Sequence, residues 1–352
     1  MKKLLCTVMA VVMSAAMVMG CGASEEPTEA PAETEAVEET VKAETSETTE
    51  EATGEMVNIG VIQYMPHASL DQNYEGFVAG LAEAGYVEGE NLTINFQNAS
   101  GEVGNCQQIC ELFANSDTDL VFAIATPAAQ SAVNVMQDTE IPILFSSVTD
   151  AVGAGLVDSN EAPGKNVTGT LDMPVIADQI AVIKDVLPEA QKLGILYTSS
   201  EANSEIQAEE AKAAAESLGM EVIIQTSSSS NDIQQVLSSV VGSVDAVYIP
   251  SDNAFANAMA TVNSTAVDNQ IPVFCAVEAM IQEGGIATTA IDYYELGKQT
   301  AAQAVRVLNG ESASEIAVET QKECALVVNK TFAESVGVEI PAEVLDNAVT
   351  VY

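Results

Sequence analysis

The sequence has few aromatic and few basic residues. Among its 352 residues there is no Trp, Phe and Tyr make up only 5%, and Lys and Arg together number 11 against 52 Asp and Glu. The formal net charge is −41, and phosphate groups would repel so acidic a chain. A nucleic-acid partner is therefore not expected. Arg306 is the single arginine, so anion recognition by guanidinium groups is not expected either.

Residues that metal centres and nucleophilic sites need are also scarce. His67 is the only histidine, and the six cysteines include no Cys-x-x-Cys pair. The strand-to-helix turns contain neither G-x-G-x-x-G nor G-x-x-x-x-G-K-[ST], the motifs that bind dinucleotides and nucleoside triphosphates. The sequence therefore predicts a protein that is not an enzyme, with no cofactor and no metal ion; the alternative is a two-lobed α/β enzyme whose site is built from Asp or Glu.

Two cysteines stand on one expected helix, "NCQQICELFANS". Cys106 and Cys110 are four positions apart, which is a poor spacing for a disulfide. We expect free and mostly buried thiols in the folded part of the chain. The apolar face of this helix is predicted to consist of Ile109, Leu112 and Phe113.

The first 56 residues predict targeting and tethering. "MKK" precedes a short apolar run, Leu4 to Met19, and then "VMGCG", which resembles the lipobox of bacterial lipoproteins. Residues 1–21 are therefore interpreted as a signal peptide with acylation at Cys21, the alternative being an ordinary secretory signal. Residues 22–56 contain 12 Glu, one Lys and almost no large apolar side chain, which predicts a disordered acidic tether.

From Val57 onward, strand and helix patterns alternate, and the same strand–turn–helix unit occurs twice. "DLVFAIATPAAQSA" and "DAVYIPSDNAFANA" are each an apolar run, a break with proline and a helix of small residues. Four strand units recur in the same order: "VNIGVIQY", "NLTINFQNA", "DLVFAIA" and "IPILFSS", then "KLGILYTSS", "MEVIIQTSSS", "VDAVYIP" and "IPVFCAVE". Fully apolar strands are typical of parallel sheets. The repeat predicts an α/β fold of two Rossmann-like lobes with parallel sheets, joined by a hinge.

The lobe boundaries follow from two expected crossings, "GKNVTGTLDMP" and the region of Ile291 and Asp292. Lobe 1 is predicted to span 57–168 plus 292–352, and lobe 2 to span 169–291. The last strand and helix pattern, "CALVVNKTFAESVG", is thus expected to return to lobe 1.

Polar residues collect where the predicted strands end. Open parallel sheets bind ligands outside the carboxyl ends of their strands, so two facing lobes would form a cleft lined by these loops. The predicted ligand-binding residues are Tyr64, Asp71, Thr126, Pro127, Ala128, Ser147, Thr149, Asp150, Asp172, Ser200, Asn203, Asp252, Asn253, Glu278 and Asp292. The alternative is that such residues only cap helices and form turns.

The charges in these loops suggest a zwitterionic ligand. Thr126 begins a helix whose free N–H groups and dipole could hold a carboxylate without arginine. Across the cleft, Asp252 could hold an ammonium group, helped by Asp150, Glu278 or Asp292. An α-amino acid carries both groups. The competing interpretation of Asp252 is a plain helix N-cap.

Several longer motifs resemble a known family. "LDQNYEGFVAGLAEAGYVEGENLTINFQNA", "AIATPAAQSA", "FSSVTDAVGAGLV", "NVTGTLDM", "GILYTSSEANS", "VDAVYIPSDN" and "AIDYYELGKQ" are similar to the substrate-binding lipoproteins of ABC transporters in the tryptophan/tyrosine-binding group. The resemblance covers about residues 57–337.

This resemblance implies a type I periplasmic-binding-protein fold that closes on a small, often aromatic, amino acid and delivers it to a membrane permease. It also implies an extracytoplasmic protein held at the bacterial membrane by the lipid on Cys21. Three alternatives stay open: the same fold could bind a nucleoside or sugar, could bind another amine, or could present its ligand to a receptor as a sensor.

Overall fold

The computed structural model describes residues 56–321 and 323–352, all within one compact unit. The predicted signal peptide with Cys21 lies outside the described residues, and so does the predicted tether apart from its last residue, Met56. No helix in the described ranges is both long enough and apolar enough to cross a membrane.

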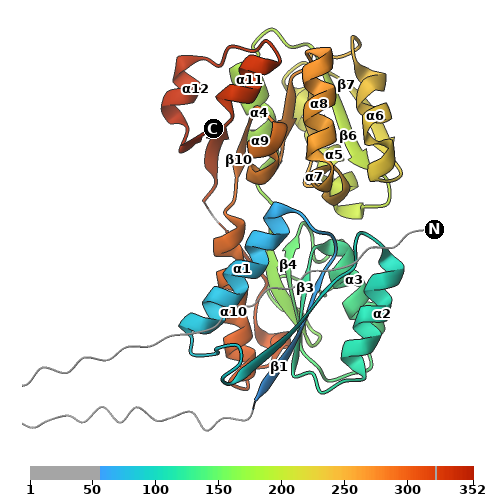
Figure 1. Ribbon diagram of the computed structural model, residues 1–352, viewed down its shortest axis with the longest axis vertical. Coiled ribbons are helices and arrows are strands. Elements are labelled where there is room, and N and C mark those ends of the chain that lie inside the picture. The colour runs from blue at the N-terminus through green and yellow to red at the C-terminus, as the bar shows by residue number, and fades with distance from the viewer. Residues whose placement is uncertain (1–55, 322) are drawn as a thin grey trace, which may run out of the picture. The chain divides into compact units, whose positions relative to one another are not determined.

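The first lobe is built on a six-stranded, fully parallel sheet in the order β11-β5-β4-β3-β1-β2. Its strands are β1 (Val57–Gln63), β2 (Leu92–Asn98), β3 (Leu120–Ile124), β4 (Ile143–Val148), β5 (Val167–Leu171) and β11 (Glu319–Thr320). Helices α1 (Ala68–Glu83) and α10 (Tyr293–Leu308) cover one face, and α2 (Val103–Ala114) and α3 (Thr126–Val135) cover the other (Figure 1).

The second lobe contains a four-stranded parallel sheet in the order β7-β6-β8-β9. Its strands are β6 (Lys192–Thr198), β7 (Glu221–Ser227), β8 (Ala246–Ile249) and β9 (Val273–Cys275). Its helices are α4 (Ile176–Val186), α5 (Ala202–Ser217), α6 (Ile233–Val240), α7 (Asn253–Asn257), α8 (Met259–Asn269) and α9 (Glu278–Gly284). The order β7-β6-β8-β9 repeats the order β2-β1-β3-β4 of the first lobe, which confirms the predicted duplication.

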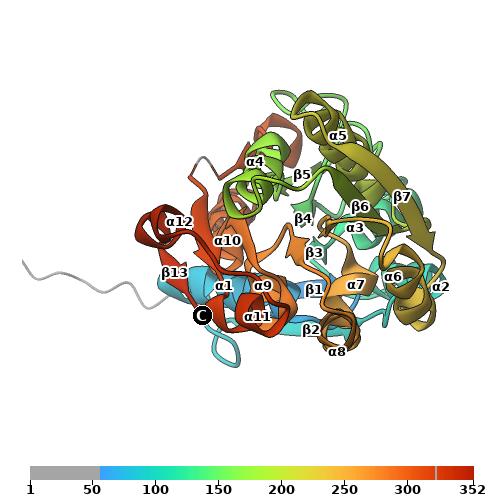
Figure 2. The same ribbon diagram turned by 90° about the horizontal axis from the view of Figure 1, so that it is seen from above.

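The C-terminal segment differs from the sequence prediction. A small sheet joins β10 (Ala287–Ala290), β12 (Ala325–Val328) and β13 (Thr350–Val351), with α11 (Lys330–Ser335) and α12 (Ala342–Asn347) beside it (Figures 1 and 2). Val327, Phe332 and Val344 are buried in the core of the second lobe.

The assignment of 292–352 to lobe 1 is therefore wrong for 325–352. It holds for α10 and β11, which pack on the first sheet. The predicted boundary after residue 168 is also too early, because β5 continues to Leu171 within that sheet. The pairing of β12 with β10, two strands that are far apart in the sequence, places the C-terminal part of the chain on the second lobe.

Helix α2 buries a different face from the one predicted. Cys106, Cys110 and Phe113 are fully buried, whereas Leu112 is 49% exposed, so the prediction for Leu112 is wrong. The two thiols act as small apolar side chains at helical spacing. Among the described cysteines all four are free: Cys324 is exposed and the other three are buried, as expected.

Helices α1 and α10 are in direct backbone contact. A Cβ at Gly76 would lie 1.9 Å from the carbonyl oxygen of Tyr294, and one at Gly297 would lie 2.0 Å from that of Asn73. Only glycine fits at such approaches. The amide of Asn73 also donates to the carbonyl of Tyr293 over 3.3 Å. These contacts fix the first residue of α10, which is part of the site described next.

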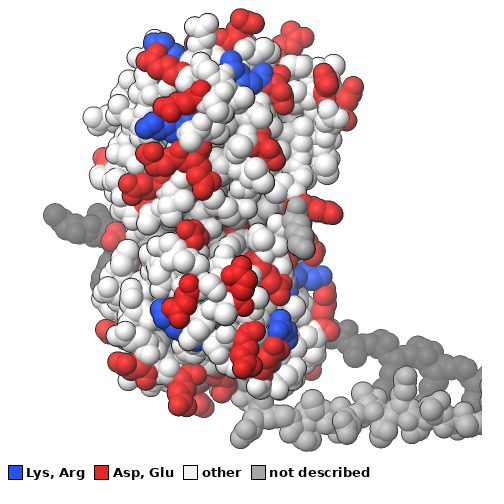
Figure 3. Space-filling model, turned by 180° about the vertical axis from the view of Figure 1, so that it is seen from behind, with Lys and Arg blue, Asp and Glu red and all other residues white. Residues whose placement is uncertain are grey.

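The surface carries the acidity expected from the composition. Figure 3 shows Asp and Glu side chains spread over the displayed face, with few Lys and Arg among them. Ion pairs such as Lys298 with Glu83, 2.8 Å apart, lie at the solvent-exposed surface and contribute little to stability.

Candidate ligand-binding cleft

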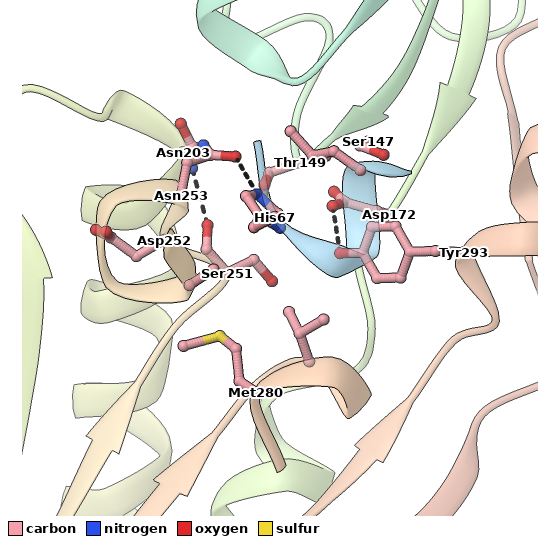
Figure 4. A pocket seen from close by; sticks show the side chains of 13 residues that line it. His67, Ser147, Thr149, Asp172, Asn203, Ser251, Asp252, Asn253, Met280 and Tyr293 are labelled. Atoms are coloured by element: carbon pink, nitrogen blue, oxygen red, sulfur yellow. Dashed lines mark hydrogen bonds between the residues drawn. The ribbon is translucent and has the colours of Figure 1, made fainter. Parts of the chain in front are cut away.

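The carboxyl ends of strands from both lobes meet at one pocket (Figure 4). It is lined by His67, Leu70, Ser147, Thr149, Asp172, Asn203, Ser251, Asp252, Asn253, Ala256, Val277, Met280 and Tyr293. The free volume is about 320 Å³, but the centre of a water-sized sphere can occupy only about 20 Å³ of it. That is room for about one water molecule. A larger guest therefore needs the lining groups to move apart.

Five buried polar atoms of this lining have no hydrogen-bond partner within the described residues. They are His67 Nδ1, Ser147 Oγ, Asp172 Oδ1, Asn203 Oδ1 and Ser251 Oγ. Buried polar groups in folded proteins are nearly always paired. Their convergence on one pocket leaves these atoms available to hydrogen-bond a guest there.

Local backbone geometry presents Ser147 to the pocket. Its φ of 56° lies in the left-handed region, which is rare for a residue with a Cβ. The pairing between β4 and β5 shifts its register between Phe145 and Val148, and such irregularities redirect a side chain. Ala125, which precedes α3, has a φ of 83°. Conformations of this kind concentrate at functional sites.

Asp172 is the pocket carboxylate with an oxygen left free. It follows β5 and is 4% exposed; its Oδ2 accepts a hydrogen bond from the hydroxyl of Tyr293 over 2.8 Å, while Oδ1 is unpaired. Burial raises the pKa of Asp172 to about 6, and the nearby Tyr293, the backbone of Asp172 and Thr149 lower it by less. No Lys or Arg is among the residues that line the pocket. A cationic ligand group would supply the missing partner.

Asp252 has a structural role instead of the predicted one. Its Oδ1 accepts hydrogen bonds from Phe255 N and from Thr198 Oγ1, both over 2.9 Å, and its Oδ2 accepts one from Thr198 N over 2.6 Å. It caps α7 and ties that helix to the end of β6. Because both oxygens are engaged inside the lobe, the prediction that Asp252 holds an ammonium group is corrected in favour of the N-cap.

Glu201 is a buried carboxylate that holds a pocket residue, Asn253, and it is not among the predicted site residues. It is 1% exposed, and its oxygens accept hydrogen bonds from Asn253 N and Ala254 N, each over 3.0 Å, and from Asn253 Nδ2 over 2.6 Å. Burial, with the nearby charge of Asp252, raises the pKa of Glu201 to about 8. Its position in "TSSEAN", between two predicted site residues, was the available signal.

The pocket gathers six of the predicted site residues: Ser147, Thr149, Asp172, Asn203, Asp252 and Asn253. The others are not among its lining residues: Tyr64, Asp71, Thr126, Pro127, Ala128, Asp150, Ser200, Glu278 and Asp292. Of these, Thr126 has a buried Oγ1 without a described partner. It begins α3 beside the end of β4, since Ile124 pairs with Ser146.

The remaining outlying residues have local hydrogen-bond partners, are exposed, or, like Pro127 and Ala128, are buried in the first lobe. The hydroxyl of Tyr64 donates to Gly101 O, and the side chain packs in the first core. The three proposed helpers for an ammonium group are engaged elsewhere, which corrects that prediction. Asp150 accepts from Gly153 N, Glu278 accepts from the hydroxyl of Tyr352, and Asp292 caps α10.

Comparison with known proteins agrees with this architecture. Residues 58–352 match the family model for ABC transporter substrate binding protein. The chain belongs to this family. Over 273 residues it is 39% identical to a tyrosine-binding protein of Clostridioides difficile, covering 78% of this chain and 79% of the relative.

Two solved structures with nearly equal sequence identity to this substrate-binding protein differ in how closely their folds superpose on it. The Streptococcus pneumoniae ABC domain in complex with L-Trp is 36% identical, with a TM-score of 0.81 over 84% of this chain and 100% of the other. A ligand-free, open substrate-binding protein from Clostridium difficile is 38% identical, with a TM-score of 0.64 over 84% of this chain and 99% of the other. The identities are nearly equal, so sequence divergence does not account for the difference between the scores.

More distantly related solved structures share the fold, but they carry no information about the ligand of this protein. A Bacillus halodurans solute-binding protein with bound myo-inositol is 18% identical with a TM-score of 0.58 over 80% of this chain and 97% of the other. This substrate-binding protein thus has the two-lobed periplasmic-binding-protein fold that its sequence predicts.

Proposed function

We propose that the protein captures an aromatic L-α-amino acid as the solute-binding component of an ABC importer. The observation that carries this proposal is the pocket itself, where unpaired polar atoms surround one buried carboxylate, Asp172. The similarity to a tyrosine-binding protein and to an L-Trp complex supports the ligand class.

The ammonium group of the ligand is proposed to bind Asp172. Oδ1 of Asp172 is free to accept a hydrogen bond, and Tyr293 holds the carboxylate in place through Oδ2. A charge-assisted bond of this kind is short and strong because both partners are ionised and desolvated. Thr149 and Asn203 stand in the same pocket and complete a polar environment.

The carboxylate of the ligand is proposed to lie toward the first lobe. Ser147 Oγ and Thr126 Oγ1 are unpaired donors at the ends of adjacent strands. The N-terminus of α3, at Thr126, adds free N–H groups and the positive end of a helix dipole. Hydroxyl and N–H donors can thus replace the arginine that this pocket lacks.

The aromatic ring is proposed to occupy the apolar part of the pocket. Leu70, Ala256, Val277 and Met280 line it. A thioether such as that of Met280 packs favourably against an aromatic ring and adapts to its shape. This combination would favour aromatic over small polar side chains.

Binding is proposed to require opening and closing of the lobes. The space in the pocket is too small for an amino acid without movement of its lining. Hydrogen bonds cross between the lobes from Gln207 to Thr149 and from Asn257 to the carbonyl of Pro66. The higher TM-score to the L-Trp complex than to the open, ligand-free relative supports a closed arrangement here.

The extracytoplasmic location and the partners belong to the same proposal. Acylation of Cys21 would anchor the chain, and the acidic tether would let the folded part reach a permease. Genes for a permease and an ATPase beside this one would support import over a sensor role.

A thermal-shift series tests the ligand. A ligand that binds the folded state raises the melting temperature by mass action. We expect shifts with L-Trp, L-Tyr or L-Phe and none with tryptamine or indole-3-propionate, which lack one charged group each. Shifts with uridine or myo-inositol and none with the amino acids would overturn the proposal.

A further inference from the structure

His67 stands at a helix-capping position but does not cap the helix. It is the N-cap residue of α1, and its side chain makes no hydrogen bond to that helix. Ser, Thr, Asp and Asn are the residues that normally serve there. The ring instead reaches the second lobe, with Nε2 3.1 Å from Asn253 Oδ1 (Figure 4). The only histidine of the chain thus bridges the two lobes at the pocket.

The orientation of Asn253 fixes which nitrogen of the ring carries hydrogen. Asn253 Nδ2 donates to Glu201 Oε2 over 2.6 Å, and Asn253 N donates to the same oxygen over 3.0 Å. The amide oxygen of Asn253 is therefore the atom turned to His67, and it can only accept. It follows that His67 Nε2 must be the donor.

The other ring nitrogen is left for the ligand. In a neutral imidazole with hydrogen on Nε2, Nδ1 is an acceptor. Nδ1 of His67 is buried and without a described partner, and the residue lines the pocket. Desolvation lowers the pKa of His67, while the bond to Asn253 and the charge of Asp71 on the same helix oppose this effect. The neutral ring is the form that fits the closed pocket.

We propose that His67 couples ligand capture to lobe closure: Nε2–H holds Asn253 of the second lobe while Nδ1 accepts a hydrogen bond from the ligand ammonium group. This inference rests on the proposed binding of an amino acid. A protonated ring would present a donor and a positive charge to that ammonium group. Acid therefore opposes both ligand contact and closure.

Other ionisable groups surround the ring and share the pH dependence. Asp71 lies on α1, Glu201 and Asp252 face it from the second lobe, and Asp172 and Tyr293 lie across the pocket. An open cleft would hydrate His67 and return its pKa toward the ordinary histidine value of about 6.5. Binding should then release a proton. As the pH is lowered between the pKa of His67 in the open protein and its lower pKa in the complex, the affinity should fall by up to about 10-fold per pH unit.

A single histidine makes this testable by NMR without assignment. The full chain, purified with a tag free of histidine, would be labelled with ¹⁵N-histidine and titrated with and without L-Trp. We expect the Nε2–H tautomer in the complex and a lower titration pH than in the ligand-free protein. An Nδ1–H tautomer in the complex, or the same titration pH in both states, would overturn the proposal.

Two substitutions separate the two nitrogens. The amide nitrogen of Gln in His67→Gln occupies the place of Nε2 and keeps the bond to Asn253, whereas His67→Asn offers an acceptor at the place of Nδ1 and falls short of Asn253. We expect each to weaken L-Trp binding by roughly 3- to 10-fold at pH 7.5, the effect of one hydrogen bond. His67→Gln should also lose the part of the acid dependence that His67 causes, leaving that of Asp172 and Glu201.

A control is Asn263→Ala. Asn263 Nδ2 donates to Glu283 O over 2.6 Å within the second lobe and outside the pocket lining, and this bond is exposed, so water replaces it. We expect a change below about 2-fold and an unaltered pH profile. Equal affinity of wild type and both His67 variants from pH 5 to 8 would refute the role of His67.

The failure of the ligand proposal would look different. If the wild-type protein bound no aromatic amino acid, the proposed function would fall. The contact between His67 and Asn253 would still be measurable in a complex with uridine or myo-inositol, whichever raises the melting temperature, through the response of the His67 resonances to Asn253→Ala. His67 resonances that are the same with and without this substitution would refute the contact whatever the ligand is.

Discussion

Replacing Asp172 by Asn should weaken ligand binding and stabilise the ligand-free protein. Asn has the shape of Asp and can still accept the hydrogen bond from Tyr293, which is 2.8 Å long in the wild type. The substitution removes only the charge that we assign to the ligand ammonium group. At about 3 Å and an effective dielectric constant of about 20, that attraction is about 5 kcal/mol before desolvation.

Desolvation of both ions offsets part of this attraction, so we expect a loss of about 3–4 kcal/mol in binding free energy. This corresponds to a roughly 100- to 1,000-fold higher Kd for L-Trp. The ligand-free protein should respond in the other direction. Burial raises the pKa of Asp172 from 3.8 to about 6, so its ionised form destabilises the fold.

The sign follows from proton linkage. Between pH 4 and 6 the folded protein holds the proton on Asp172 and the unfolded chain releases it, so the free energy of unfolding falls as the pH rises. Above pH 6 the penalty is constant at about 2–3 kcal/mol. Asp172→Asn should therefore raise the melting temperature of the ligand-free protein at pH 7.5 while nearly abolishing binding.

Two measurements check this prediction. Because the chain has no Trp, the fluorescence of added L-Trp reports binding directly, and scanning calorimetry reports stability. Asp268→Asn on α8, an exposed carboxylate outside the pocket, is the control and should change neither. Wild-type affinity in Asp172→Asn would refute the ammonium site, and a lowered melting temperature would refute the electrostatic account of Asp172.

Three further outcomes follow from the fold. Gly297→Ala should lower the free energy of unfolding, measured in urea, by about 2–4 kcal/mol, because its Cβ would meet the backbone of α1. Gly104→Ala is the control and should leave the free energy of unfolding unchanged, because nothing lies within 4 Å of its Cβ. Equal effects of the two substitutions would contradict the contact between α1 and α10. Asp252→Ala should cost about 1–2 kcal/mol by loss of the cap on α7, and an unchanged urea midpoint would exclude that role. Of the four described thiols, Cys324 alone should be alkylated in the folded state, and modification of the three buried ones without urea would show that α2 or the end of β9 opens.

The duplicated sheets could be predicted because their signal is local. Each strand in "DLVFAIA" or "VDAVYIP" is apolar along its whole length, and each is followed by a helix pattern, so burial on two faces is written in consecutive residues. The carboxyl-end rule then predicted Ser147 and Asn203, and the interlobe crossing predicted Asp172; all three line the pocket of the structure.

The missed and corrected residues depend on partners far along the chain. A buried carboxylate after a strand can hold a ligand or cap a helix. Asp252 caps α7 through Phe255 N, and Thr198, 54 residues earlier, engages its other oxygen as well. Glu201 is connected to the pocket through Asn253, which lies 52 residues later in the sequence and donates a hydrogen bond to it. His67 is separated by 186 residues from the amide it contacts.

The amino-acid sequence alone determined the α/β class, the twofold repeat and the loops that carry polar groups, because hydrophobic periodicity and turn chemistry act between near neighbours. Tertiary structure decided that β12 joins the second lobe, that Asp252 is satisfied within its lobe while Asp172 keeps a free oxygen, and that His67 meets Asn253. These outcomes depend on which hydrogen-bond partners remain after the strands have paired, and that is a property of the whole packed chain.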